Sequence, residues 1–276
     1  MALDSAAAAY NAVVDVADGL LVALDFDGTL APIVDDPEVA LIHPRAHEVL
    51  VRLAARVRTI AVVTGRPARQ VLALGGLDEV GDAIGEDGRE LVVLGQYGNE
   101  RWTSAQRRVV SPKPPPGLAS FLGDLPRLLR EAGASDVWTE EKGLAVAVHT
   151  RRTAEPAATY DRLLPVLSKA AADRGLSVEP GRMVIEVRAP GMDKGKALRS
   201  LVTSYDARGI VFVGDDLGDV PAFEAVLALR EEGFPGLLVC SGSDEQSALR
   251  SLSDLVVPGP DGVMDFLDDL AATLDS

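Results

Sequence analysis

The segment LLVALDFDGTL at residues 20–30 joins an unbroken apolar run to a short acidic turn that contains a glycine. An apolar run of this length is typical of a strand that is buried on both faces, as in a parallel sheet. Similar short runs recur along the chain, at 59–63, 91–94, 210–213, 237–240 and 254–257. We therefore predict a parallel sheet, with turn residues after its strands.

Amphipathic helical patterns separate several of these runs. After Pro44, apolar residues recur at a spacing of three and four up to Val57, which predicts a helix that packs one face on the sheet. Comparable patterns occupy 193–205, 220–231 and 262–274. Strands that alternate with helices predict an α/β fold with a doubly wound, Rossmann-like parallel sheet.

The pattern changes in the middle of the chain. SPKPPPG at 111–117 cannot continue a helix or a central strand, and predicted helices follow it at 118–132 and 155–174. The segments 143–151 and 181–188 alternate in polarity, which is typical of a sheet with one covered and one open face. We therefore expect an α+β domain at 109–189, inserted into a core formed by 1–108 and 190–276.

The composition limits the expected partners. The chain has 276 residues, 42 of them acidic and 27 basic, for a formal net charge of −15. This charge repels nucleic acid and anionic membranes. The N-terminal residues lack a signal-peptide pattern, no apolar run approaches the ~20 residues of a spanning helix, and Cys240 is the single cysteine. We expect a cytoplasmic monomer that acts on a small molecule, without nucleic-acid or membrane partners.

Oxygen-bearing side chains follow three of the predicted strands. Asp25 and Asp27 follow the first, Thr64 follows the second, and GDDLGD at 214–219 follows the fourth. Because ligands bind at the carboxyl ends of strands in open α/β sheets, up to five carboxylates are expected to converge there. Asp and Gly are also ordinary turn residues, but three such segments together favour a site. Ligand oxygens without histidine or cysteine favour Mg²⁺.

The order of these segments resembles the haloacid dehalogenase (HAD) superfamily of phosphohydrolases. DFDGTL at 25–30 is similar to the nucleophile motif of that superfamily. Thr64, Lys194 in DKGKAL and the segment 214–219 are similar to its second, third and fourth motifs. The resemblance implies a phosphatase with a HAD-like core and an inserted cap domain.

A closer resemblance runs from about residue 21 to residue 270. The matching segments are VTGR at 63–66, GQYGNER at 95–101, EEKG at 140–143, HTR at 149–151, GRMVIEVR at 181–188, DKG at 193–195 and GDD at 214–216. Together they are similar to the trehalose-6-phosphate phosphatase family, which implies hydrolysis of trehalose 6-phosphate. The family often differs at four positions: Thr64, Tyr97, Thr150 and Gly218. Because Tyr97 and Thr150 lie in substrate-side segments, a phosphatase for another sugar phosphate stays the alternative.

The resemblance also implies roles for the core residues. Asp25 is the expected nucleophile, which forms an aspartyl-phosphate, and Asp27 is the expected general acid and base. The side chains of Asp25 and Asp215 and the main-chain carbonyl of Asp27 are expected to bind Mg²⁺. Asp216 and Asp219 either reach the metal through water or orient Lys194. The phosphate group is expected to contact three residues: Gly28, Thr64 and Lys194.

Sugar recognition is expected from the inserted domain. Alternation in MVIEVR puts Glu186 and Arg188 on the face opposite Ile185. The family resemblance implies substrate contacts from Glu140, Lys142 and Glu186, whose charged groups suit sugar hydroxyls. A substrate contact and a structural or surface role both stay open for three further residues: Arg66, His149 and Arg188.

Two other classes of protein share parts of this pattern. Receiver domains also gather strand-end aspartates and a lysine, but they need neither Asp27 nor an inserted domain. A dinucleotide-binding oxidoreductase is disfavoured because no G-x-G-x-x-G follows the first strand. The sequence therefore favours a Mg²⁺-dependent phosphatase.

Overall fold

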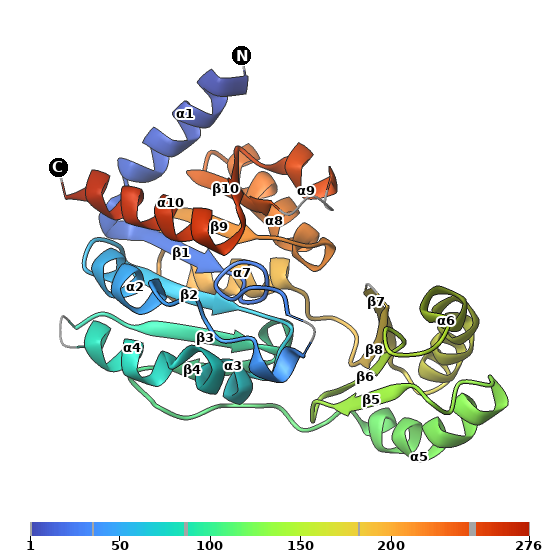
Figure 1. Ribbon diagram of the computed structural model, residues 1–276. Coiled ribbons are helices and arrows are strands. Elements are labelled where there is room, and N and C mark those ends of the chain that lie inside the picture. The colour runs from blue at the N-terminus through green and yellow to red at the C-terminus, as the bar shows by residue number, and fades with distance from the viewer. Residues whose placement is uncertain (1, 35, 86–87, 182, 243–246, 276) are drawn as a thin grey trace. The chain divides into compact units, whose positions relative to one another are not determined.

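The computed structural model describes residues 2–34, 36–85, 88–181, 183–242 and 247–275. The chain divides into two compact units, one formed by residues 1–111 and 193–276 and the other by residues 112–192. The first unit contains the larger of the two sheets drawn in Figure 1, and the second contains the smaller one. Each unit has hydrophobic core residues of its own.

The first unit is built on a seven-stranded sheet with the order β11-β10-β9-β1-β2-β3-β4. Its strands are β1 (Leu20–Leu24), β2 (Thr59–Val63), β3 (Leu91–Gly95), β4 (Glu100–Thr103), β9 (Gly209–Gly214), β10 (Gly236–Gly242) and β11 (Leu255–Pro258). Neighbouring strands are parallel except β3 and β4, which are antiparallel. The predicted parallel sheet is confirmed. The short edge strand β4 was not predicted, because its sequence ERWT mixes charged and apolar side chains.

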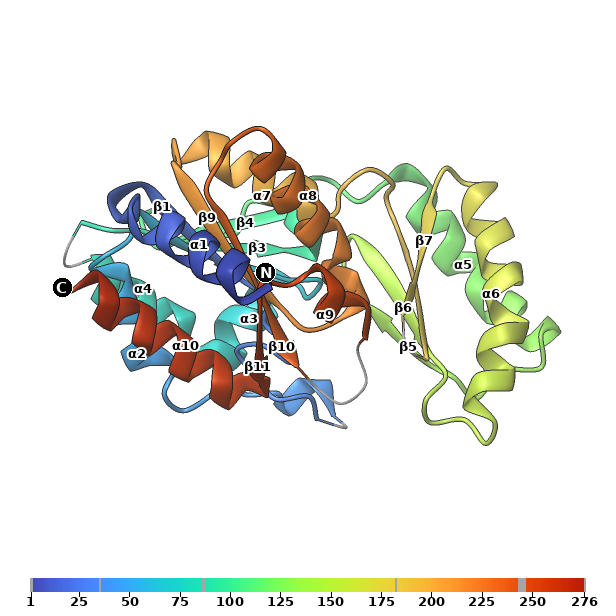
Figure 2. The ribbon, with the colours of Figure 1, turned by 90° about the horizontal axis from the view of Figure 1, so that it is seen from above.

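Helices cover both faces of this sheet. They are α1 (Ala2–Val14), α2 (Ala46–Ala54), α3 (Ala68–Gly75), α4 (Leu77–Gly85), α7 (Lys194–Ser204), α8 (Val220–Glu231), α9 (Ser247–Leu252) and α10 (Gly259–Leu274). In β1, Val22 packs in one core with α2 and α10, whereas Leu21 and Ala23 pack in another with α7 and α8. Figure 2 shows these two pairs of helices on opposite sides of the sheet. Because both faces are covered, all of β1 is buried, which explains its unbroken apolar run.

The start of α2 differs from the prediction. Pro44 and Arg45 form a turn, and the helix begins at Ala46. The apolar residues that predicted this helix lie on its buried face, among them Val49, Leu50 and Leu53. The periodicity therefore located the helix, whereas the proline did not mark its first residue.

The second unit is a four-stranded antiparallel sheet with the order β5-β6-β8-β7. Its strands are β5 (Trp138–Glu141), β6 (Ala145–His149), β7 (Ser177–Gly181) and β8 (Val184–Arg188). The helices α5 (Pro116–Glu131) and α6 (Pro156–Ala172) share a core with Val146, Val148, Ile185 and Val187. Only these alternate residues of β6 and β8 join the helix-covered core, as the alternation predicts. The residues on the opposite face of these strands are also buried, so the prediction that this face is open is wrong; they are Ala145, Ala147, Glu186 and Arg188.

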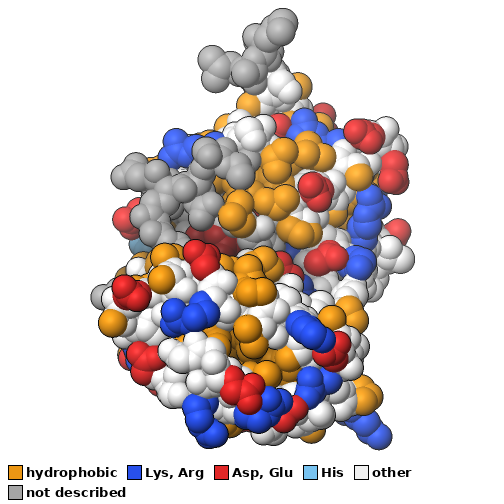
Figure 3. All heavy atoms as spheres, turned by 90° about the vertical axis from the view of Figure 1, so that its right-hand side faces the viewer, with side chains coloured by type: hydrophobic (Ala, Val, Ile, Leu, Met, Phe, Trp, Pro, Cys, Tyr) orange, Lys and Arg blue, Asp and Glu red, His pale blue; other side chains and the backbone are white. Residues whose placement is uncertain are grey.

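The surface carries charges of both signs. Figure 3 shows basic and acidic side chains interspersed on the face that it draws. Among the described residues, no helix combines the length and the apolar character that a membrane crossing requires.

Candidate active site

The carboxyl ends of β1, β2 and β9 meet at one edge of the larger sheet. Leu24 of β1 pairs with Val62 of β2 and with Val213 of β9. The residues that follow these strands are therefore neighbours, and they are Asp25, Thr64 and Asp215. The strand order thus brings together oxygen-bearing side chains that are far apart in the sequence.

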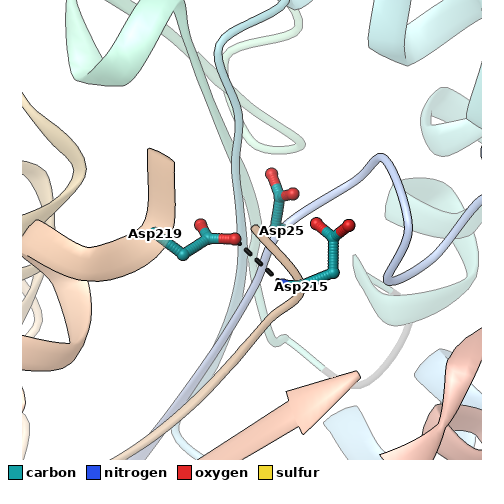
Figure 4. A group of neighbouring side chains, drawn as sticks. All are labelled: Asp25, Asp215 and Asp219. Carbon is teal, nitrogen blue, oxygen red and sulfur yellow. Dashed lines mark hydrogen bonds between the residues drawn. The ribbon is translucent and has the colours of Figure 1, made fainter. Parts of the chain in front are cut away.

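Three aspartates form a buried cluster at this edge. One carboxylate oxygen from each of Asp25, Asp215 and Asp219 lies within 4.8 Å of those of the other two. Their residues are 4%, 4% and 0% exposed, respectively. In Figure 4 the Asp219 carboxylate points toward the main chain of Asp215, whose amide donates to it at 3.0 Å. Carboxylates that lie this close together and are this deeply buried need a compensating positive charge.

Lys194 supplies part of that charge. Its Nζ atom donates to Asp25 Oδ1 and to Asp219 Oδ1, at 2.6 Å in both cases. The lysine is the first residue of α7, whose first turn is capped by Asp193 through the Lys196 amide. It is only 4% exposed. A lysine is buried to this extent only when it is paired, so this one belongs to the aspartate cluster.

The turn after β9 holds Asp219 in place. The short 3₁₀ helix η4 (Leu217–Asp219) carries a reciprocal capping box, in which Asp216 Oδ1 accepts from the Gly218 amide at 2.8 Å. Asp219 Oδ2 accepts from the amides of Asp215 and Asp216 at 3.0 and 3.3 Å. Asp216 therefore stabilises the turn, whereas Asp219 ties the turn to Lys194.

Burial shifts the protonation equilibria of the cluster. Burial, reinforced by Asp25 and Asp219, raises the pKa of Asp215 to about 10. Burial also raises the pKa of Asp25 well above its usual value, although Lys194 opposes that shift. Burial alone would lower the pKa of Lys194, but Asp219 and Asp25 outweigh it, so the pKa of the ammonium is raised. One ammonium thus faces three carboxylates, two of which retain protons more strongly than usual.

These residues fit a hard divalent cation. The grouped ligand atoms are all carboxylate oxygens, the donors that Mg²⁺ and Ca²⁺ prefer. Gly28 has a φ of +71°, and a Cβ atom there would lie 2.1 Å from Asp215 Oδ2. A glycine at this position therefore keeps the space beside that carboxylate open.

Ser241 secures the same glycine turn from β10. Its Oγ atom donates to the Gly28 carbonyl at 2.5 Å, and the serine is 1% exposed. The sequence analysis did not identify Ser241 as a site residue. The available signal was its position directly after the apolar run 237–240, at the same edge of the sheet.

Asp27 pairs with Arg66. The Nε and Nη2 atoms of Arg66 donate to the two carboxylate oxygens of Asp27, at 2.6 Å each. Among the described residues, the buried cluster joins Asp25 to Asp215 and Asp219, and Asp27 lies outside it. Thr64 lies nearby, 1% exposed, and its Oγ1 atom accepts from the Arg66 amide at 3.1 Å. The structure therefore joins two candidate residues to which the sequence analysis gave separate roles.

The candidate sugar contacts of the second unit share the face of its sheet that lies opposite the helix-covered core. Glu186 of β8 lies opposite Ala147 of β6, which lies opposite Glu140 of β5. Lys142 Nζ donates to Glu186 Oε2 at 2.7 Å. Glu186 is 5% exposed, which is unusual for a residue on a face without helices. Ala147, which lies between the two glutamates, is fully buried.

His149 and Arg188 lie on the same face, opposite the helix-covered core. His149 Nε2 lies 3.2 Å from Glu140 Oε2, and its ring centroid is 4.3 Å from that of Trp138. Arg188 pairs with Glu179 of β7 at 2.6 Å. His149 therefore contacts Glu140, a candidate sugar contact, whereas Arg188 contacts Glu179, a carboxylate of the neighbouring strand.

Comparison with known protein families gives one match across most of the chain. The family model described as trehalose-phosphatase matches residues 23–115 and 127–256. A trehalose-phosphate phosphatase of Mycobacterium avium is 31% identical over 97% of this chain and 67% of its own length. One from Mycobacterium tuberculosis is 32% identical over 94% of this chain and 64% of its own length. An uncharacterized glycosyl hydrolase of that organism is 34% identical over 91% of this chain, which spans 18% of that protein.

Solved structures share the fold. The C-terminal domain of a Candida albicans trehalose-6-phosphate phosphatase superposes with a TM-score of 0.75 over 97% of this chain, at 18% identity. A haloacid dehalogenase-like hydrolase from Bacteroides thetaiotaomicron superposes with a TM-score of 0.64 over 91% of this chain, at 16% identity. The predicted HAD-like fold is confirmed.

Proposed function

The chain belongs to the trehalose-phosphatase family, and on that premise we propose that it hydrolyses trehalose 6-phosphate to trehalose and phosphate. The observation that carries the proposal is the buried Lys194, which holds Asp25 and Asp219 at 2.6 Å beside Asp215. A family match could persist in a chain that had lost its catalytic residues. A buried carboxylate and ammonium at the carboxyl edge of the sheet support an active enzyme instead.

In the first step, a carboxylate oxygen of Asp25 attacks phosphorus, and the bond between phosphorus and the sugar oxygen breaks. Asp27 gives its proton to that sugar oxygen, so trehalose leaves as a neutral alcohol. The product on the protein is an aspartyl-phosphate at Asp25. Asp25 suits this role because it lies directly after β1, with its amide hydrogen-bonded to Val213 at 2.9 Å, which limits its motion.

In the second step, water attacks phosphorus and the bond between phosphorus and Asp25 breaks. Asp27, now a carboxylate, takes the proton of the water molecule, and inorganic phosphate leaves. Both residues return to their starting states, so atoms and protons balance over the cycle.

Thr64 and Lys194 would bind the phosphate oxygens. Lys194 would act as a point charge and Thr64 as a hydroxyl donor. The contacts of Asp219 with Lys194 and with two main-chain amides support a role in orienting the lysine. Asp216, whose side chain caps η4, supports the shape of that turn.

We also propose that Mg²⁺ binds at the aspartate cluster, held by the Asp25 and Asp215 side chains and the Asp27 carbonyl. Bound there, the cation would offset the repulsion between an anionic nucleophile and an anionic phosphate. The raised pKa values of Asp25 and Asp215 support this assignment, because burial, together with the neighbouring carboxylates, disfavours their charged forms more than Lys194 favours them.

Sugar recognition is assigned to the face of the second unit's sheet that lies opposite the helix-covered core. Glu140, Lys142 and Glu186 would accept from and donate to sugar hydroxyls, and the pairing of Lys142 with Glu186 presents both charges together.

Tyr97 and Thr150 depart from the residues common in the family. Thr150, which follows β6, is fully buried, and its hydroxyl donates at 3.3 Å to the carbonyl of Met183, which precedes β8. This contact links the ends of the two neighbouring strands.

The test is phosphate release from a panel of sugar phosphates in the presence of Mg²⁺. Trehalose 6-phosphate should show the highest kcat/KM, ahead of glucose 6-phosphate and sucrose 6-phosphate. A higher kcat/KM for another sugar phosphate would keep the phosphatase and replace the substrate. No release from any member of the panel would overturn the proposal.

A further inference from the structure

Arg66 lies directly after the Thr64 turn, and each nitrogen of its guanidinium donates to a group of the protein. Nε and Nη2 donate to the two oxygens of Asp27 at 2.6 Å, and Nη1 donates to the Pro37 carbonyl at 2.7 Å. The guanidinium carbon lies 6.0 Å from the centre of the Phe26 ring. The side chain is only 11% exposed. Arg66 is therefore held on three sides.

We propose that Arg66 is a positioning residue that fixes the orientation of the Asp27 carboxylate, an inference that rests on the proposed function. A carboxylate can rotate about its terminal bond, and two parallel hydrogen bonds to one planar group fix the plane of that carboxylate. The Pro37 carbonyl, in the 3₁₀ helix η2 (Pro37–Val39), fixes the opposite side of the same guanidinium. Both oxygens of Asp27 accept in this pair, so the two hydrogen bonds hold its carboxylate form, which is the base of the second step. In the first step one oxygen carries the proton, and the other keeps its hydrogen bond to Arg66. The loop after β1 thereby positions this side chain in both steps.

The geometry disfavours the two simpler roles. A sugar or phosphate ligand of Arg66 would compete for the edge formed by Nε and Nη2, which Asp27 already occupies with both oxygens. A surface role conflicts with the low exposure of the side chain. A lysine could not reproduce these contacts, because its ammonium lacks the planar fork that meets two oxygens at once.

The test compares Arg66→Ala and Arg66→Lys with wild type on two substrates, trehalose 6-phosphate and p-nitrophenyl phosphate. A sugar alkoxide needs a proton to leave, whereas p-nitrophenolate leaves readily without one. Both variants should therefore lose about 10- to 100-fold in kcat for the sugar phosphate, and much less for the aryl phosphate. KM and the inhibition constant of inorganic phosphate should change by less than about threefold, because neither substrate nor phosphate contacts Arg66. Guanidinium chloride at millimolar concentration should restore part of the kcat of Arg66→Ala.

Two controls separate positioning from general damage. Arg107→Ala removes an exposed arginine that pairs with Asp82 and Asp78, and it should leave both activities at wild-type values. In an Asp27→Asn background, adding Arg66→Ala should lower aryl phosphate turnover by less than about threefold, since Arg66 acts through the lost carboxylate. Thermal unfolding checks that each variant is folded, and Arg66→Lys keeps the cation if Arg66→Ala does not fold.

Three results would overturn the inference while wild type hydrolyses trehalose 6-phosphate. A rise in KM with an unchanged kcat would make Arg66 a sugar contact. An equal loss on both substrates with weaker inhibition by phosphate would make it a phosphate ligand. Full activity of Arg66→Lys would show that the planar fork is unnecessary. If wild type releases phosphate from neither substrate, the proposed function fails, and this inference fails with it.

Discussion

At the scale of single residues, Lys194 explains why Asp25 and Asp219 can be buried. Its ammonium lies 2.6 Å from an oxygen of each, and such short contacts offset part of the cost of removing the charges from water. Asp215 lies beside them with its pKa raised to about 10 by burial and by its carboxylate neighbours. At neutral pH without a cation, Asp215 therefore holds a proton that a divalent metal would displace.

This proton predicts how stability depends on pH. The Asp215 carboxyl has a folded pKa of about 10 against 3.8 for the ordinary group, so between these values the folded state binds more protons than the unfolded chain. The stability of the metal-free protein should then fall as pH rises through this window.

Asp215→Asn removes the titrating group and should make the fall shallower. Urea unfolding in EDTA at pH 6 and pH 9 measures both slopes, with Mg²⁺ addition expected to stabilise wild type more than the variant. Equal slopes in the two proteins would contradict the assignment.

Residue pairing is also where sequence reasoning reached its limit. The carboxyl-edge positions of Asp25 and Asp215 followed from the strand pattern, because parallel strands end at one edge. The contact of Arg66 with Asp27 depends on side-chain rotamers and on a loop carbonyl at Pro37, and no periodicity encodes either. Ser241 meets Gly28 across 213 positions of sequence, so only the folded chain reveals that contact.

At the scale of elements, helix packing on one or on two faces decided how the strands could be predicted. β1 and β9 are buried throughout and read as continuous apolar runs, whereas β6 and β8 face helices on one side and read as alternation. The edge strands β4 and β5 are short and partly exposed, so their sequences ERWT and WTEE carry no clear pattern. Alternation in β8 also explains how Glu186 and Ile185 can serve opposite faces of one sheet.

That alternation predicts the effect of Glu186→Gln. Glu186 lies on the face opposite the helix-covered core and pairs with Lys142 at 2.7 Å, so the change alters a charge without opening a cavity in that core. The kcat/KM for trehalose 6-phosphate should fall about 10- to 1000-fold, the equivalent of one or two charged hydrogen bonds. Turnover of p-nitrophenyl phosphate should change much less, because it has no sugar hydroxyls.

Glu141→Gln is the matched control for this prediction. Glu141 is the exposed neighbour of Glu140 on the opposite face of β5, and its loss should leave both substrates unaffected. Equal losses on both substrates in a folded Glu186→Gln protein would remove the second unit from sugar recognition.

At the scale of the whole molecule, one sheet collects residues from two distant parts of the chain. Asp25 and Thr64 precede the second unit in sequence, whereas Lys194, Asp215 and Asp219 follow it. The HAD-like fold could be predicted because segments similar to the four HAD motifs occur along the chain in the expected order. The sugar could not be derived from strand patterns, because recognition depends on particular side chains such as Glu140 and Lys142 rather than on periodicity.

The cluster also predicts a metal requirement for the whole enzyme. Chelation with EDTA should abolish phosphate release, because the aspartate cluster would then lack the cation that offsets the repulsion between the nucleophile and an anionic substrate. Mg²⁺ should restore activity, and Ca²⁺ should restore it poorly, since its larger and looser coordination disturbs the alignment of the reacting groups. Full activity after exhaustive chelation would contradict the metal assignment.

The central claim is that this chain releases phosphate from trehalose 6-phosphate through Asp25. The most direct measurement is kcat/KM for that substrate with Mg²⁺, for wild type and for Asp25→Asn, with circular dichroism and thermal unfolding to verify the fold. Asp25→Asn removes the nucleophile and changes little volume, so it should retain less than about a thousandth of wild-type activity. An inactive wild type, or a folded Asp25→Asn protein that retains more than this fraction, would contradict the account.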